Sequence, residues 1–140
     1  SVKQIIEERQ RQSIDPILAN SSKLKVAIVE DDQDLLELMR LTVSSLPVPT
    51  EILSTTDGFK GLILLGEFRP DVVITDLNMP GMDGFRMLKA IEGSEFSPSK
   101  LIITTALDSN SFALRGGLPE RAHILHKPFA LSELESLILQ

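Results

Sequence analysis

The chain has 140 residues, of which 42% are hydrophobic and 24% are charged, and its formal net charge is −6. These values are typical of one soluble globular domain, and the acidic balance argues against direct nucleic-acid binding by this segment. No apolar run reaches the length of a membrane span and no signal-type leader opens the chain, so we expect a cytoplasmic protein without membrane contact. The chain has no cysteine and two histidines, which excludes thiolate metal sites and argues against a histidine-rich zinc site.

The first 23 residues differ in character from the rest of the chain. Residues 1–12 have a helical pattern with few apolar positions, and Pro16 lies among Asn and Ser residues that follow. Helices this polar are marginally stable alone, and such clusters favour loops. We therefore predict an N-terminal helical arm and linker over residues 1–23, dispensable for the core, and a compact domain over residues 24–140.

From residue 24 onward, short apolar β-branched runs alternate with segments of helical spacing. The predicted strands are residues 24–29, 50–55, 71–75, 100–105 and 122–126. The predicted helices are residues 33–46, 57–68, 83–93, 109–117 and 131–140. Asp83 is the expected cap of the third helix, and Ser132 with Glu135 the expected capping box of the last. This alternation predicts an α/β fold with a parallel sheet covered by helices on both faces.

Chemically active side chains follow several of the predicted strands. Glu30 and Asp31 follow the first strand, Asp76 the third, Thr105 ends the fourth, and Lys127 follows the fifth. The carboxyl ends of parallel strands share one edge of a sheet. Clustered carboxylates repel unless a cation compensates them, and oxygen ligands alone favour Mg²⁺. A carboxylate beside such a metal can act as a nucleophile and form an aspartyl phosphate.

Four segments carry a family resemblance. AIVEDD, VVITDLNMPGMDG, IITTA and HKPF occur in this order, each at the end of a predicted strand. Together they resemble the receiver domain of bacterial two-component response regulators, over about residues 24–140. The resemblance implies a flavodoxin-like, doubly wound, five-stranded parallel sheet of order 2-1-3-4-5 with helices on both faces.

The same resemblance implies a function and its partners. The domain would be a phosphoacceptor signalling switch that takes a phosphoryl group from a sensor histidine kinase or a phosphotransfer protein. Phosphorylation would change its partner-binding surface, and its only catalysis would be its own phosphoryl transfer and dephosphorylation. The output domain or partner is left open, in the same full-length chain or apart from it, and so is a homodimer.

The resemblance also assigns residues. The implied catalytic residues are Asp76 as phosphoacceptor, Thr105 as switch hydroxyl, and Lys127. The implied Mg²⁺ ligands are Glu30, Asp31, Asp76 and the backbone carbonyl of Asn78. The peptide bond between Lys127 and Pro128 is expected to be cis, as is usual in the family.

One departure from the family pattern keeps an alternative open. The switch aromatic of the family lies three residues before the lysine, and this chain has Ile124 there and no tyrosine. The alternative is a phosphorylation-independent, receiver-like protein-binding module. A flavodoxin-like cofactor binder is a third class, but the acidic EDDQD segment after the first strand would repel a phosphate group.

Overall fold

The computed structural model describes residues 2–12, 23–79, 82–83, 88–89, 91, 98–107, 118–119 and 121–140. Within them, five parallel strands form one sheet in the order β2-β1-β3-β6-β7. The strands are β1 (Leu24–Val29), β2 (Thr50–Thr55), β3 (Val72–Asp76), β6 (Lys100–Thr105) and β7 (His123–His126). Counted along the sheet's own strands, this order is 2-1-3-4-5. The predicted fold is therefore confirmed, with β3 reaching one residue further than expected, to Asp76.

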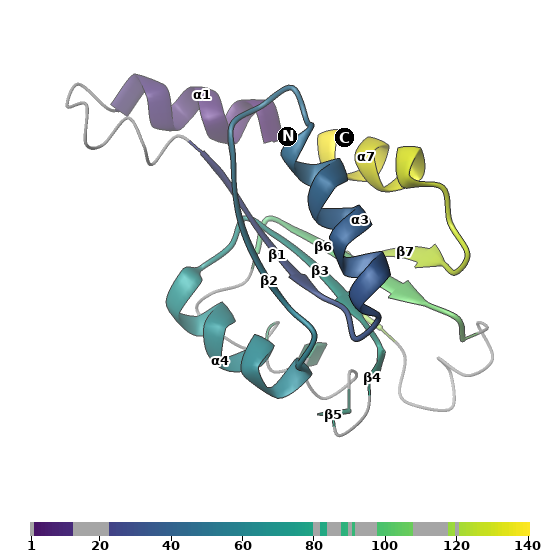
Figure 1. Ribbon diagram of the computed structural model, residues 1–140. Helices are drawn as coiled ribbons and strands as arrows, with labels where there is room; N and C mark the ends of the chain where they lie inside the picture. The colour runs from purple at the N-terminus through teal and green to yellow at the C-terminus, as the bar shows by residue number, and fades with distance from the viewer. Residues whose placement is uncertain are drawn as a thin grey trace.

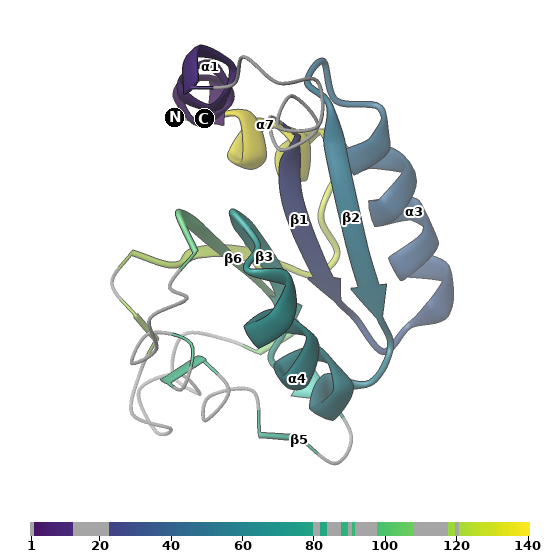
Figure 2. The same ribbon diagram turned by 90° about the vertical axis from the view of Figure 1, so that its left-hand side faces the viewer.

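Helices cover both faces of this sheet (Figures 1 and 2). They are α1 (Val2–Gln12), α3 (Gln33–Ser44), α4 (Gly58–Phe68) and α7 (Leu131–Leu139). The first, second and last of these pack on one face, and α4 packs on the other. The helix predicted over residues 83–93 lies mostly outside the described residues, and the one predicted over 109–117 lies wholly outside them. No helix in the described part of the chain is long and apolar enough to cross a membrane.

The core has two layers, one on each face of the sheet. On the face of α1, α3 and α7, buried strand residues pack against the helices; they include Val26, Ile28, Val72, Ile74, Ile102 and Leu125. On the face of α4, the buried strand residues are Ala27, Val29, Val73, Leu101 and Ile103. Both faces of the central strands are apolar because helices cover both of them.

The approach of α4 to the sheet depends on a glycine. A Cβ atom on Gly61 would lie 2.9 Å from Val29 Cγ2 and 3.2 Å from Val29 Cγ1. On the same helix, a Cβ on Gly66 would meet nothing within 4 Å. Gly61 therefore lets α4 lie close against β1, which explains a helix-weakening residue within a helix.

Helix α7 begins at Leu131, as predicted, but its N-terminal cap differs from the expected one. Its N-cap is Ala130, and the capping box expected from Ser132 and Glu135 is wrong. Alanine has no side-chain acceptor, so half of a capping box is missing. The Glu133 carboxylate accepts a hydrogen bond from the Ala130 N–H at 3.4 Å. In contrast, Asp32 caps α3 with its side chain, accepting from two backbone N–H groups.

Helix α1 packs on the domain more closely than its polar sequence suggests. Val2 and Ile6 are 2% and 6% exposed and belong to the core layer of α3 and α7. Figure 1 shows α1 beside the C-terminal end of α7, at the edge where the strands begin. The expectation that the arm adds little to the core therefore needs correction, because two of its few apolar side chains are buried. The domain boundary at residue 24 stays a prediction.

Candidate functional site

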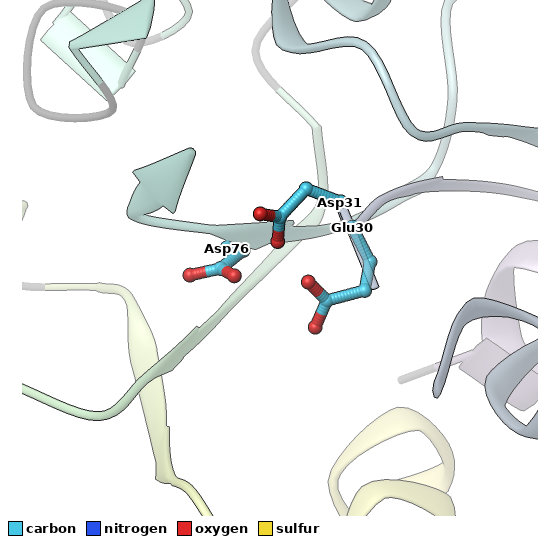
Figure 3. Close-up of side chains that lie close together, drawn as sticks. All are labelled: Glu30, Asp31 and Asp76. Atoms are coloured by element: carbon cyan, nitrogen blue, oxygen red, sulfur yellow. The ribbon is translucent and has the colours of Figure 1, made fainter. Parts of the chain in front are cut away.

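Two neighbouring strands bring three carboxylates together at the carboxyl edge of the sheet. Val29 of β1 pairs with Thr75 of β3, so the next residues, Glu30 and Asp76, are also neighbours. Carboxylate oxygens of Glu30, Asp31 and Asp76 lie within 4.8 Å of one another. Figure 3 shows the three side chains close together. Glu30 and Asp76 are buried, whereas Asp31 is exposed. The group thus opens to solvent on one side.

Lys127 joins this group from the end of β7. Its Nζ donates to Glu30 Oε1 at 2.6 Å and to Asp76 Oδ2 at 2.8 Å. The Lys127 backbone N–H donates to the carbonyl of Thr105 at 2.7 Å, which ties the loop to the end of β6. The peptide bond between Lys127 and Pro128 is cis, as predicted.

The electrostatics of the site follow from burial and from these contacts. Burial raises the pKa of the Glu30 carboxyl, the Lys127 hydrogen bond lowers it, and contact with Asp76 and Asp31 raises it again, to about 7. Burial lowers the pKa of the Lys127 ammonium, but its bonds to Asp76 and Glu30 outweigh this and raise it above its usual value. Lys127 therefore stays charged, while Glu30 is close to its protonation point at neutral pH.

Two neighbouring residues, Thr75 and Asn78, hold Asp76 in place through hydrogen bonds. The Asn78 N–H donates to Asp76 Oδ1 at 2.9 Å, and the Thr75 hydroxyl donates to the Asp76 carbonyl at 3.2 Å. Asn78 begins β4 (Asn78–Met79), which pairs antiparallel with β5 (Met82–Asp83) just after β3. The sequence indicated only a turn-rich loop here, so this short pairing and the N–H contact from Asn78 were both missed.

Thr105 lies at the end of β6 and is fully buried. Its Oγ1 accepts a hydrogen bond from the Leu107 N–H at 2.9 Å, so in this state it is bonded within its own loop. Ile124, at the position of the family's aromatic, lies on β7 and is 36% exposed. Of the predicted site residues, the structure thus brings Glu30, Asp31, Asp76 and Lys127 into one group, with Asn78 and Thr105 on adjoining segments.

The donor set fits a hard divalent cation. Three carboxyl groups face a single ammonium, that of Lys127, so the group keeps a net negative charge even when Glu30 is protonated. All three candidate side-chain ligands offer carboxylate oxygens. Mg²⁺ and Ca²⁺ prefer such oxygen ligands, whereas softer metals prefer nitrogen or sulfur ligands. Lys127 already neutralises part of this charge through its bonds to Glu30 and Asp76. Glu30, Asp31 and Asp76 are therefore the residues that could hold Mg²⁺.

The chain matches a known protein family and resembles several curated proteins. A family model described as "Response regulator receiver domain" matches residues 26–139, which is most of the chain. The chain is 28% identical over 125 residues to "Probable C4-dicarboxylate response regulator DctR" of Halalkalibacterium halodurans, covering 88% of this chain and 53% of that protein. It is 32% identical over 111 residues to "Response regulator MprA" of Mycobacterium sp. (strain KMS), covering 79% and 47%. The chain thus spans about half the length of these curated relatives.

Solved structures agree with this placement. The chemotaxis protein CheY4 of Vibrio cholerae superposes with a TM-score of 0.71 at 26% identity, covering 84% of this chain and 97% of that one. The N-terminal domain of an uncharacterized Wolinella succinogenes protein superposes with a TM-score of 0.66 at 33% identity, covering 83% and 91%.

Proposed function

Since the chain belongs to the response regulator receiver domain family, whose members are phosphoacceptor signalling switches, we propose that Asp76 is its phosphoacceptor. The observation that carries this proposal is the contact between the Lys127 ammonium and Asp76 Oδ2, inside a group of three converging carboxylates. Asp76 is 3% exposed and is held by Asn78 N–H, so its carboxylate is a rigidly placed nucleophile.

The proposed reaction is a direct transfer. A carboxylate oxygen of Asp76 attacks the phosphorus of the donor, an oxygen–phosphorus bond forms, and the bond to the donor's nitrogen or oxygen breaks. Lys127 supplies a positive charge to a phosphoryl oxygen, for which it exchanges one of its carboxylate partners. Thr105 accepts a hydrogen bond in the resting state, so its own hydroxyl hydrogen is available to a second phosphoryl oxygen.

Glu30, Asp31, Asp76 and the Asn78 carbonyl are the proposed ligands of a Mg²⁺ ion. Bound there, the ion would supply the positive charge that phosphoryl oxygens need beside so many carboxylates. The donor set of oxygens and the residual negative charge of the group support this assignment. Asp31 is the exposed member and faces the side from which a phosphodonor approaches.

The partners are proposed from the family and from the relatives' names. We propose a histidine of a sensor kinase or phosphotransfer protein as the phosphodonor, and a cytoplasmic location. The output lies in a further domain or partner, because the matched relatives are about twice as long as the match. Receiver domains are in general signalling modules rather than enzymes, and the chemistry proposed here is confined to the domain's own transfer and hydrolysis.

The second candidate is a receiver-like module that binds partners without phosphorylation. Only Ile124 favours it, because the chain lacks the aromatic side chain of the family's switch. The close approach of three carboxylates and Lys127 supports the phosphoacceptor function instead. A module that did not use phosphate would have no need of this buried, costly arrangement.

The proposal predicts metal-dependent labelling. Incubation with acetyl phosphate and millimolar Mg²⁺ should add one acid-stable, base-labile phosphoryl group, and chelation with EDTA should prevent it. Asp31→Asn should weaken the response to Mg²⁺, whereas Asp34→Asn, on an exposed turn of α3 nearby, should not. The readouts are intact mass and backbone amide shifts during a Mg²⁺ titration. Equal labelling with and without Mg²⁺, or no amide shift at the ends of β1 and β3, would contradict the metal site.

A further inference from the structure

Three buried threonines lie at the carboxyl end of the central strands, and the hydroxyl of one of them has no hydrogen-bond partner within the described part of the chain. Thr75 Oγ1 donates to the Asp76 carbonyl, and Thr105 Oγ1 accepts from the Leu107 N–H. Thr104 is fully buried, yet its Oγ1 has no hydrogen-bond partner among the residues that the structure describes. A buried hydroxyl without a partner costs free energy, and such a group calls for an explanation.

The register of the sheet places Thr104 beside the proposed phosphoacceptor. Asp76 of β3 pairs with Thr104 of β6, and neighbouring strands lie about 4.8 Å apart. Ile74 and Ile102, two residues earlier on each strand, both belong to the core layer of α1, α3 and α7. Because alternate residues share a face, Asp76 and Thr104 leave the sheet on that same face.

Asp76 does not need a further donor in the resting state. The Asn78 N–H occupies Oδ1 and the Lys127 ammonium occupies Oδ2. Phosphoryl transfer turns one of these carboxylate oxygens into the bridging oxygen of a mixed anhydride, the acyl phosphate. It also brings new anionic oxygens that compete for the ammonium, because charged acceptors bind it more strongly. The remaining acyl oxygen of Asp76 then has fewer donors than before.

Resting on the proposed role of Asp76, we propose that Thr104 is a positioning residue for the aspartyl phosphate. Its hydroxyl donates a hydrogen bond to the acyl oxygen of Asp76 once Lys127 turns toward the phosphoryl group. The hydroxyl thus has no partner among the described residues in the resting state and gains one in the phosphorylated state. Such a bond favours the phosphorylated conformation over the resting one, which is how a small contact biases a two-state switch.

The test measures both states with one variant. Thr104→Val keeps the side-chain shape and removes the hydroxyl, so the resting domain should melt at a higher temperature than the parent. The apparent affinity for beryllium fluoride with Mg²⁺, a phosphoryl mimic, should fall about two- to tenfold, the worth of one neutral hydrogen bond. Thr104→Ser, which retains the hydroxyl, should bind the mimic as the parent does.

A control variant on the same strand distinguishes a loss of core packing from a loss of the proposed hydrogen bond of Thr104. Ile102→Val lies two residues away on the same strand and face, and it should lower the melting temperature without changing the affinity for the mimic. If Thr104→Val binds the mimic as tightly as the parent while Asp76→Asn does not bind it, Thr104 has no positioning role and the proposed function stands. If Asp76→Asn binds the mimic as the parent does, the proposed function and this inference both fail. Should Thr104→Val not fold, equal binding by Thr104→Ala and Thr104→Ser would overturn the inference, and weaker binding by Thr104→Ala alone would support it.

Discussion

At the scale of single residues, Lys127 partly neutralises the negative charge of the candidate site. One ammonium contacts two buried carboxylates that belong to different strands, Glu30 on the end of β1 and Asp76 on β3. Removing one member of such a buried pair leaves the others uncompensated. The group keeps a net negative charge, and its exposed member is Asp31. A divalent cation bound there would neutralise this charge.

Glu30 makes the stability of the metal-free domain depend on pH. Burial and the neighbouring carboxylates raise the pKa of its carboxyl from 4.5 to about 7, despite the bond from Lys127. Between these values the folded state binds more protons than the unfolded state, so the free energy of unfolding falls as pH rises. From this one group the slope is at most about 1.4 kcal/mol per pH unit.

Urea unfolding in EDTA across that pH range measures this slope. Glu30→Gln should remove the part of the slope that Glu30 contributes, because the amide does not titrate. Glu135→Gln, an exposed carboxylate on α7, is the control and should leave the slope unchanged. A Glu30→Gln protein that keeps the parent's pH dependence would contradict the raised pKa of Glu30.

The sequence predicted that four side chains of the candidate site would converge, because of how parallel strands are arranged. Glu30, Asp31, Asp76 and Lys127 each follow a strand, and parallel strands end at one edge, so their convergence could be predicted. The contact of Lys127 with Glu30 could not, because it depends on how two distant segments fold side by side. The Thr104 hydroxyl has no partner among the residues described here because of how the strands pack, and no local pattern indicated this.

At the scale of elements, the strands were predicted well and the helix ends less well. Each strand is a short β-branched apolar run, a strong local signal. The start of α7 at Leu131 was predicted, but its capping box was wrong. Ser132 and Glu135 have the spacing of a capping box, whereas the N-cap residue is Ala130. The pairing of β4 with β5 was missed because two-residue strands depend on turn geometry.

Gly61 and Gly66 on α4 offer a matched pair of alanine substitutions. Gly61→Ala should destabilise the domain by about 1–3 kcal/mol, because its Cβ would lie 2.9 Å from Val29 Cγ2 on β1. Gly66→Ala should stabilise it by up to about 1 kcal/mol, the gain in helix propensity at an open position. Denaturant unfolding of the two variants checks this. Equal effects of the same sign would contradict the close packing of α4 on β1.

At the scale of the whole molecule, the candidate site and helix α1 lie at opposite ends of the strands (Figure 1). The carboxylates lie where the strands finish, and α1 packs where they begin (Figures 1 and 3). Lys127 joins the carboxylates through its hydrogen bonds to two of them. Lys100, at the start of β6, donates to the carbonyls of Leu137 and Gln140 at the end of α7. The N-terminal arm and the C-terminal end of the described chain therefore share one edge of the domain, away from the site.

The packing of α1 predicts that the arm stabilises the domain. A chain beginning at Lys23 should fold with the same sheet but unfold at lower denaturant, because Val2 and Ile6 lose their buried contacts. Burying one such side chain contributes about 1.5–3 kcal/mol, which is an upper bound for a helix at the chain end. Val2→Ser should reproduce part of the loss, and Lys3→Ser, on the exposed side of α1, should not. Unchanged stability after the truncation would show that the arm is dispensable, as its sequence first indicated.

The central claim, that Asp76 accepts the phosphoryl group, is tested most directly by comparing the two ends of β3. Asp76 ends the strand within the site, and Asp71 precedes it, buried at the opposite edge, where it accepts from the Lys25 N–H. After incubation with acetyl phosphate and Mg²⁺, the parent and Asp71→Asn should each gain one phosphoryl group by intact mass. Asp76→Asn should gain none, because an amide is a poor nucleophile. Labelling of Asp76→Asn to the level of the parent, or no labelling of the folded parent by any phosphodonor, would contradict the account.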